Sequence, residues 1–119
     1  MKRISESYIN KYLPQMNLKE ISIEGQTKIF NAKIVVIGLG GVGTPFLTYM
    51  CRAGISSIGI VDHDKVTLSN LHRQIMFFPK DINKKKTISV KSQINQIDKN
   101  VKVKIFNTKI SKKKYKKYN

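Results

Sequence analysis

A glycine-rich run stands between an apolar segment and a helix-like segment. It reads Gly38-Leu39-Gly40-Gly41-Val42-Gly43, and it follows the apolar residues 34–37. Glycines at this spacing let the backbone turn tightly and approach a phosphate closely. The phosphate then meets free N–H groups at the start of the following helix. The run predicts a nucleotide-binding turn, although many kinds of nucleotide-binding enzyme share the pattern.

Acidic residues follow the next apolar segment. Asp62-His63-Asp64 begins 19 residues after Gly43, at the end of the run Ile58-Gly59-Ile60-Val61. An acid at the end of such a strand normally accepts hydrogen bonds from ribose hydroxyls, whereas a pair of Asp residues also favours a simple turn. Asp62 is therefore the candidate ribose ligand.

Cationic and amide side chains come next in the chain. The segment 68–74 reads Leu-Ser-Asn-Leu-His-Arg-Gln, and Lys86 follows after a loop. The planar fork of Arg73, the point charge of Lys86 and the neutral donor of Asn70 all suit charge that builds on phosphoryl oxygens. A hydride-transferring enzyme has no need of this set, so the set favours an enzyme that breaks a triphosphate. The alternative for Lys86 is a solvated lysine cluster, because Lys84 and Lys85 adjoin it.

The surrounding patterns predict the elements that must position these residues. Helices are expected over 5–12, ending before Pro14, and over 21–30. Strands are expected over 33–38, 58–62 and 101–106, with helices over 44–52 and 84–98 between them and Gly54 as a left-handed helix end. This order implies parallel strands joined by right-handed crossovers. We predict an α/β fold with a Rossmann-like three-layer parallel sheet, made of a helical segment (1–32) and a nucleotide-binding domain (33–119).

Charge and composition narrow the function classes. The net charge is +16, and 20 of the 23 basic residues are Lys. Proteins that read nucleic-acid sequence usually employ Arg, so the excess predicts salt-sensitive, non-specific attraction to polyanions and no specific nucleic-acid role. Lys, Ile and Asn make up 46 of the 119 residues, as in AT-rich genomes. We therefore expect a cytoplasmic protein, or one of the plastid stroma.

Cysteine content and hydropathy exclude further classes. No segment approaches the roughly 20 apolar residues of a membrane span, and the N-terminus lacks the apolar core of a signal peptide. Cys51 is the single cysteine, which excludes an internal disulfide or a cysteine-pair zinc site in this chain. Its position within an apolar helix predicts a core residue and not a nucleophile.

Taken together, the motifs resemble the ubiquitin-activating type of adenylating enzyme, the MoeB/ThiF/HesA group. The likeness is closest to molybdopterin-synthase adenylyltransferase and its thiamine-pathway counterpart. It rests on the glycine run, Asp62-x-Asp64, the segment 68–74 and Glu24-Gly25-Gln26, and it weakens after about Val103. The resemblance implies that the C-terminal glycine carboxylate of a ubiquitin-like sulfur-carrier protein attacks the α-phosphate of ATP. An acyl-adenylate forms and pyrophosphate leaves, in molybdenum cofactor or thiamine biosynthesis.

The resemblance also implies roles for individual residues. Arg73 and Lys86 would be catalytic, and the family pattern Gly-x-Pro-Lys reads Asn83-Lys84-Lys85-Lys86 here, which leaves Lys85 possible. The family arginine that reaches into the partner subunit's site corresponds to Pro14, although a homodimer is still implied for the complete protein. The implied ATP contacts are Gly41, Asp62, Ser69, Asn70, Leu71, His72, Arg73 and Lys86.

The chain is expected to be the N-terminal part of something longer. The resemblance places the family's Mg²⁺-binding Asp and its zinc cysteines beyond Asn119, so we expect no ATP–pyrophosphate exchange from these 119 residues alone. Strand 33–38 should lie inside a wider sheet, and Ser111 is expected to begin a basic helix over 112–119. Two alternatives remain: an NAD-dependent oxidoreductase, from the glycines and Asp62, and a basic nucleic-acid-binding module.

Overall fold

The computed structural model describes residues 1–111. Two helices, α1 (Glu6–Met16) and α2 (Ser22–Asn31), precede the strands β1 (Lys33–Ile37), β2 (Ser57–Val61) and β3 (Lys102–Phe106). Helix α3 (Gly43–Ala53) joins β1 to β2, and helix α4 (Lys86–Ile97) leads into β3. Two 3-10 turns, η1 (Leu68–Asn70) and η2 (Pro79–Asp81), lie in the long connection before α4. The predicted order of elements is confirmed, while the helix predicted over 112–119 lies outside the described residues.

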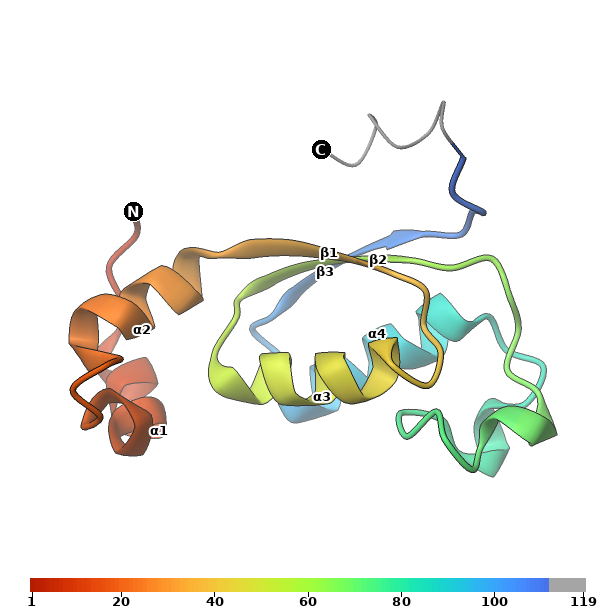
Figure 1. The fold of residues 1–119 in the computed structure, drawn as a ribbon, viewed down its shortest axis with the longest axis horizontal. Coiled ribbons are helices and arrows are strands. Elements are labelled where there is room, and N and C mark those ends of the chain that lie inside the picture. Colours follow the sequence, from red (N-terminus) through yellow and green to blue (C-terminus); the bar gives the residue numbers. More distant parts are fainter. Residues whose placement is uncertain (112–119) are drawn as a thin grey trace.

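The three strands form one parallel sheet in the order β1-β2-β3. Helices α3 and α4 lie on the same face of this sheet (Figure 1), as successive right-handed crossovers in one direction require. The α/β arrangement with parallel strands is the one predicted. Of the three predicted layers, the described residues form the sheet and one helical layer. Within them β1 is an edge strand, and its side chains Val35 and Ile37 are 41% and 49% exposed.

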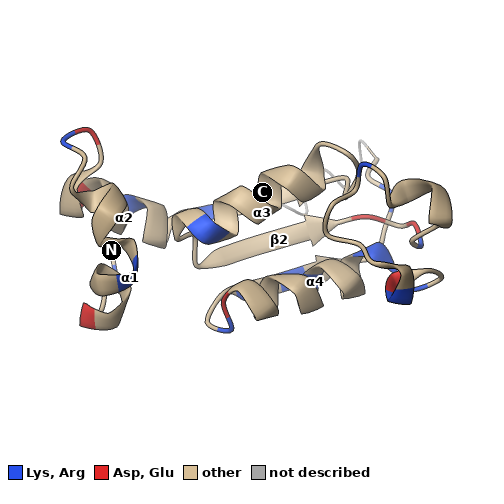
Figure 2. Ribbon diagram, turned by 90° about the horizontal axis from the view of Figure 1, so that it is seen from below, with Lys and Arg blue, Asp and Glu red and all other residues tan. Residues whose placement is uncertain are grey.

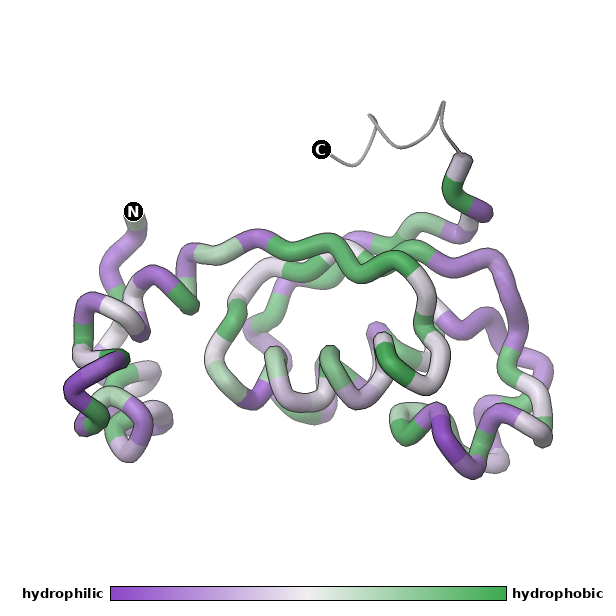
Figure 3. The backbone as a smooth tube through the Cα atoms, viewed as in Figure 1, coloured by the Kyte–Doolittle hydropathy of each residue, from purple (hydrophilic) through white to green (hydrophobic). Residues whose placement is uncertain are grey.

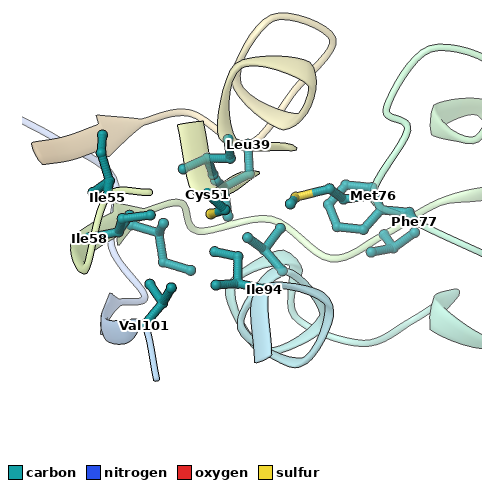
Figure 4. Close-up of a cluster of buried hydrophobic side chains, with 12 residues drawn as sticks. Leu39, Cys51, Ile55, Ile58, Met76, Phe77, Ile94 and Val101 are labelled. Carbon is teal, nitrogen blue, oxygen red and sulfur yellow. The ribbon is translucent and has the colours of Figure 1, made fainter. Parts of the chain in front are cut away.

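The core lies between the sheet and its two helices (Figure 4). Ile58 and Ile60 of β2 belong to one buried cluster with Leu47 of α3 and Ile94 of α4. Cys51 is part of this cluster, and burial raises the pKa of its thiol to about 11. The prediction that Cys51 is a core residue is confirmed. Figure 3 shows the apolar residues concentrated along the strands, and no helix of the described part is long and apolar enough to cross a membrane.

Helix α1 corrects one prediction, because it continues through Pro14 to Met16. Proline removes one intrahelical hydrogen bond and strains the preceding turn, a cost that normally ends a helix. Here the residues that follow gain tertiary partners. Gln15 Nε2 donates to the carbonyl of Ala53 at 2.8 Å, and Met16 is buried. These contacts stabilise a last turn that local propensity disfavours.

The end of α3 is held by side chains from α1 and α2. Gly54 has φ +111°, the left-handed helix end that was predicted. Tyr8 Oη donates to the Gly54 carbonyl at 2.7 Å, and Gln26 Nε2 donates to the Ala53 carbonyl at 3.0 Å. The last carbonyls of α3 therefore find partners outside their own helix. A Cβ at Gly54 would collide with Tyr8 Oη, so glycine is required by both backbone conformation and space.

Candidate functional site

The residues singled out by the sequence gather at one end of the sheet. The glycine-rich loop leaves the carboxyl end of β1, and the segment 62–85 leaves the carboxyl end of β2 (Figure 1). Helices α1 and α2 lie at the opposite end. In open parallel sheets, ligands bind in the crevice outside the carboxyl ends of the strands. The arrangement therefore places the loop where a nucleotide is expected.

Two glycines of the loop are required for different physical reasons. Gly38 has φ +92°, which allows the sharp turn out of β1. A Cβ at Gly43 would collide with the carbonyl oxygen of Gly38, so this position must be glycine for the helix to start close to the strand. Within residues 1–111, the N–H groups of Gly41 and Val42 donate no hydrogen bond. They lie at the amino end of α3, where free N–H groups and the helix dipole favour an anion.

Asp62 fastens the loop to the end of β2. Its Oδ2 accepts the N–H of Leu39 and its Oδ1 accepts the N–H of Asp64, both at 2.8 Å. Each carboxylate oxygen has a second lone pair, so Asp62 can still accept a ribose hydroxyl. Figure 2 shows the acidic residues that follow the tip of β2. His63 Nε2 lies 3.3 Å from Asp64 Oδ1, and the imidazole makes this small cluster poorly suited to Mg²⁺, which prefers oxygen ligands.

The segment after Thr67 folds back on itself and presents Arg73. Asn70 Oδ1 accepts the N–H of Thr67 at 3.0 Å and closes the 3-10 turn η1. Arg73 Nη1 donates to the carbonyl of Ser69 at 3.0 Å and lies 3.3 Å from His72 Nε2. Ser69, His72 and Arg73 are all solvent-exposed, so these side chains can reach a ligand.

Arg73 lies directly against the glycine-rich loop. A Cβ placed on Gly41 would be 3.5 Å from both Cγ and Cδ of Arg73. The stem of the Arg73 side chain thus lies beside Gly41, one of the two loop residues whose N–H has no partner within residues 1–111. Leu71 lies on the other side of the same turn and packs against the core, which supports the turn from within.

Lys86 differs from the lysines before it. Its backbone N–H donates to the carbonyl of Asp64 at 3.0 Å, and the N–H of Val66 donates to the carbonyl of Lys84 at 2.9 Å. These bonds tie the start of α4 to the segment that follows β2. Lys86 is only 6% exposed, whereas Lys84 and Lys85 are exposed. Lys86 therefore has its side chain packed at the carboxyl end of the sheet, and its neighbours point to solvent.

The sequence analysis did not assign two residues that contact the loop. Thr44 is fully buried, and its hydroxyl donates to the Gly40 carbonyl at 2.8 Å. A hydroxyl residue directly after the last glycine could have indicated this role. Gln74 is 3% exposed and lies against Gly40. Its position directly after Arg73 in the segment 68–74 could have indicated that it lies near the loop.

Residues 12–118 match the ThiF family. The chain belongs to the ThiF family. The predicted family resemblance is confirmed, and membership does not support the two alternatives, an NAD-dependent oxidoreductase and a nucleic-acid-binding module.

Several members of the ThiF family are similar in sequence. A sulfur carrier protein adenylyltransferase of Thermus thermophilus is 31% identical over 109 residues, which cover 92% of this chain and 40% of that protein. A probable molybdopterin-synthase adenylyltransferase of Porphyra purpurea is 39% identical over 84% of this chain and 26% of its own length. The adenylyltransferase and sulfurtransferase UBA4 of Vanderwaltozyma polyspora is 45% identical over 81% of this chain and 22% of its own length. The chain thus spans between 22% and 40% of these three relatives.

Solved structures of the same kind share the fold. Escherichia coli tRNA N6-threonylcarbamoyladenosine dehydratase in complex with ATP superposes with a TM-score of 0.85 and is 26% identical, covering 97% of this chain and 46% of that one. Escherichia coli MccB with ATP superposes with a TM-score of 0.81 and is 27% identical, covering 98% of this chain and 36% of that one. The ThiF-family chain therefore has the Rossmann-like α/β fold that was predicted.

Proposed function

We propose that this ThiF-family chain binds ATP and contributes to adenylation of the C-terminal glycine carboxylate of a ubiquitin-like sulfur-carrier protein. The observation that carries the proposal is the position of Arg73 beside Gly41, in a loop where two N–H groups have no partner within residues 1–111. Two kinds of finding support it. The similar proteins named above are sulfur carrier and molybdopterin-synthase adenylyltransferases, and two solved neighbours hold ATP.

The geometry suits an exchange of bonds at the α-phosphate. A carboxylate oxygen of the carrier forms a bond to the α-phosphorus, and the bond from that phosphorus to the bridging oxygen breaks, so pyrophosphate leaves with the electron pair. The carboxylate is already an anion, so no general base is needed. The task of the protein is to hold two anions together and offset the charge on the phosphates. The loop N–H groups, Arg73 and Lys86 supply that positive potential.

We assign the nucleotide contacts as the motifs suggest, with Arg73 and Lys86 in the catalytic role. Asp62 would hold the loop and accept a ribose hydroxyl, while Asn70 would support the turn that carries Arg73. The full proposed set is Gly41, Asp62, Ser69, Asn70, Leu71, His72, Arg73 and Lys86. Residues 33–119 would form the nucleotide-binding domain, with residues 1–32 as a separate helical segment.

Magnesium would accompany ATP in this site and neutralise part of the phosphate charge. The described residues fit it poorly, because the cluster Asp62, His63 and Asp64 includes an imidazole, whereas Mg²⁺ prefers oxygen ligands. We therefore place no described side chain on the metal. Cys51 is buried in the core and is not a zinc ligand. We also propose that the complete protein forms a homodimer and that it is located in the cytoplasm or the plastid stroma.

Isothermal titration of the 119-residue chain with Mg-ATP and with NAD⁺ tests the nucleotide. ATP should bind saturably and NAD⁺ should not; binding of NAD⁺ without a response to ATP would refute the proposal. The carrier is tested by titrating the ATP-loaded chain with a ubiquitin-like sulfur-carrier protein and with the same carrier lacking its last glycine. Equal binding of both carriers would show that the terminal glycine, and the position of the carboxylate that it carries, is not recognised.

A further inference from the structure

Gln74 has a buried side chain that the proposed contacts do not use. Its exposure is 3%, and within residues 1–111 its Oε1 has no hydrogen-bond partner. An amide oxygen that is removed from water and gains no partner lowers stability. Gln74 Nε2 donates no hydrogen bond within residues 1–111 either, so the donor end of the amide is free for a ligand that accepts one.

The Gln74 carboxamide lies against the glycine-rich loop. A Cβ at Gly40 would be 3.9 Å from Nε2 of Gln74. The backbone N–H of Gln74 donates to the Asn70 carbonyl at 2.9 Å, as the N–H of Arg73 does at 3.2 Å. One turn of the chain therefore presents both side chains to the loop. Gln74 lies beside Gly40, and Arg73 lies beside Gly41.

The geometry points to Gln74 as a further nucleotide-binding residue, whose Nε2 donates a hydrogen bond to a phosphate oxygen of a nucleotide on the loop. This inference rests on the proposed function. A carboxamide is a directional donor without charge, so it can orient a phosphate that Arg73 and Lys86 attract. Since no protein group within residues 1–111 engages Oε1, the amide can turn toward a ligand without breaking a bond at that atom.

Gln74→Met separates a ligand contact from a structural role. Methionine has a similar length and no amide, so it removes the hydrogen bond and also the unpartnered oxygen. In the 119-residue chain we expect ATP affinity to fall about five- to tenfold, with a melting temperature that is unchanged or higher. The matched control is Gln96→Met on the exposed face of α4, which should change neither quantity.

A second variant tests the sign of the interaction. Gln74→Glu would set a negative charge beside the phosphates and should weaken ATP binding more than Gln74→Met does. Unchanged ATP affinity in either variant would overturn the inference. A lower melting temperature with a parallel loss of affinity in Gln74→Met would also overturn it, since it would mark a structural amide. Failure of the unaltered chain to bind ATP would instead refute the proposed function.

Discussion

Gly41 and Arg73 lie side by side, although they belong to different motifs. A Cβ at position 41 would lie 3.5 Å from Cγ and Cδ of Arg73 and 3.8 Å from its Nε. These are ordinary van der Waals distances, so alanine would fit, but a larger side chain would displace the arginine. The backbone N–H of Gly41 can bind an anion, and the planar guanidinium of Arg73 belongs to the neighbouring side chain. A glycine-rich turn alone can bind a nucleotide, but a turn with an arginine beside it can also stabilise charge that builds on the phosphates.

The glycines at 41 and 43 should respond differently to alanine. Gly41→Ala should leave the melting temperature within about 2 °C and weaken ATP binding at least about fivefold, because its methyl group stands beside the loop N–H groups. Gly43→Ala should lower the free energy of unfolding by about 2 kcal/mol or more, because its Cβ collides with the Gly38 carbonyl. Thermal unfolding and calorimetric titration of both variants check this. Equal stability of the two variants would contradict the loop geometry.

Arg73→Ala should lower ATP affinity about 10- to 100-fold, the effect of losing hydrogen bonds to a charged group. The free energy of unfolding should change by less than about 0.5 kcal/mol, since Arg73 is exposed and its hydrogen-bond partners, Ser69 and His72, are local. Arg52→Ala, at the exposed last turn of α3, is the matched control and should bind ATP normally. If stability and affinity fell together in Arg73→Ala, the residue would be structural.

Lys86→Met and Lys85→Met decide between the two neighbouring lysines. Methionine preserves much of the apolar stem by which a buried lysine packs, so Lys86→Met should remain folded. We expect ATP affinity to fall about tenfold in Lys86→Met and less than twofold in Lys85→Met, measured by titration. The reverse order would assign the phosphate contact to Lys85.

The thiol of Cys51 should make stability depend on pH in alkaline solution. Burial raises the pKa of Cys51 from 9.0 to about 11. The neutral thiol is therefore favoured in the folded state, and its contribution is full below pH 9 and is lost as pH rises toward 11. Urea unfolding of the native chain and of Cys51→Ala, at intervals from pH 8 to 11, should give curves that converge by up to about 2 kcal/mol. A difference independent of pH would contradict a buried thiol.

The order of the elements and the position of the loop could be predicted from local patterns. A strand needs a short apolar run, and a helix start or end shows in nearby residues such as Ser5 and Gly54. These signals act over a few residues, so they survive in the sequence alone. Helix α1 was mispredicted for the same reason. Its last turn depends on Gln15 reaching the end of α3, which no local pattern contains.

In the candidate site, too, some features could be predicted from the sequence and others could not. The residue types alone indicated phosphate chemistry, because glycine, arginine and lysine at these spacings each have a definite interaction with an anion. Only the tertiary structure decided which side chains meet. It brought Arg73 to Gly41, engaged both oxygens of Asp62, buried Lys86 and not Lys85, and left the Gln74 oxygen without a partner within residues 1–111. The physical reason is that the path of the segment 62–85 is set by contacts with the loop and with α4, between residues far apart in the chain.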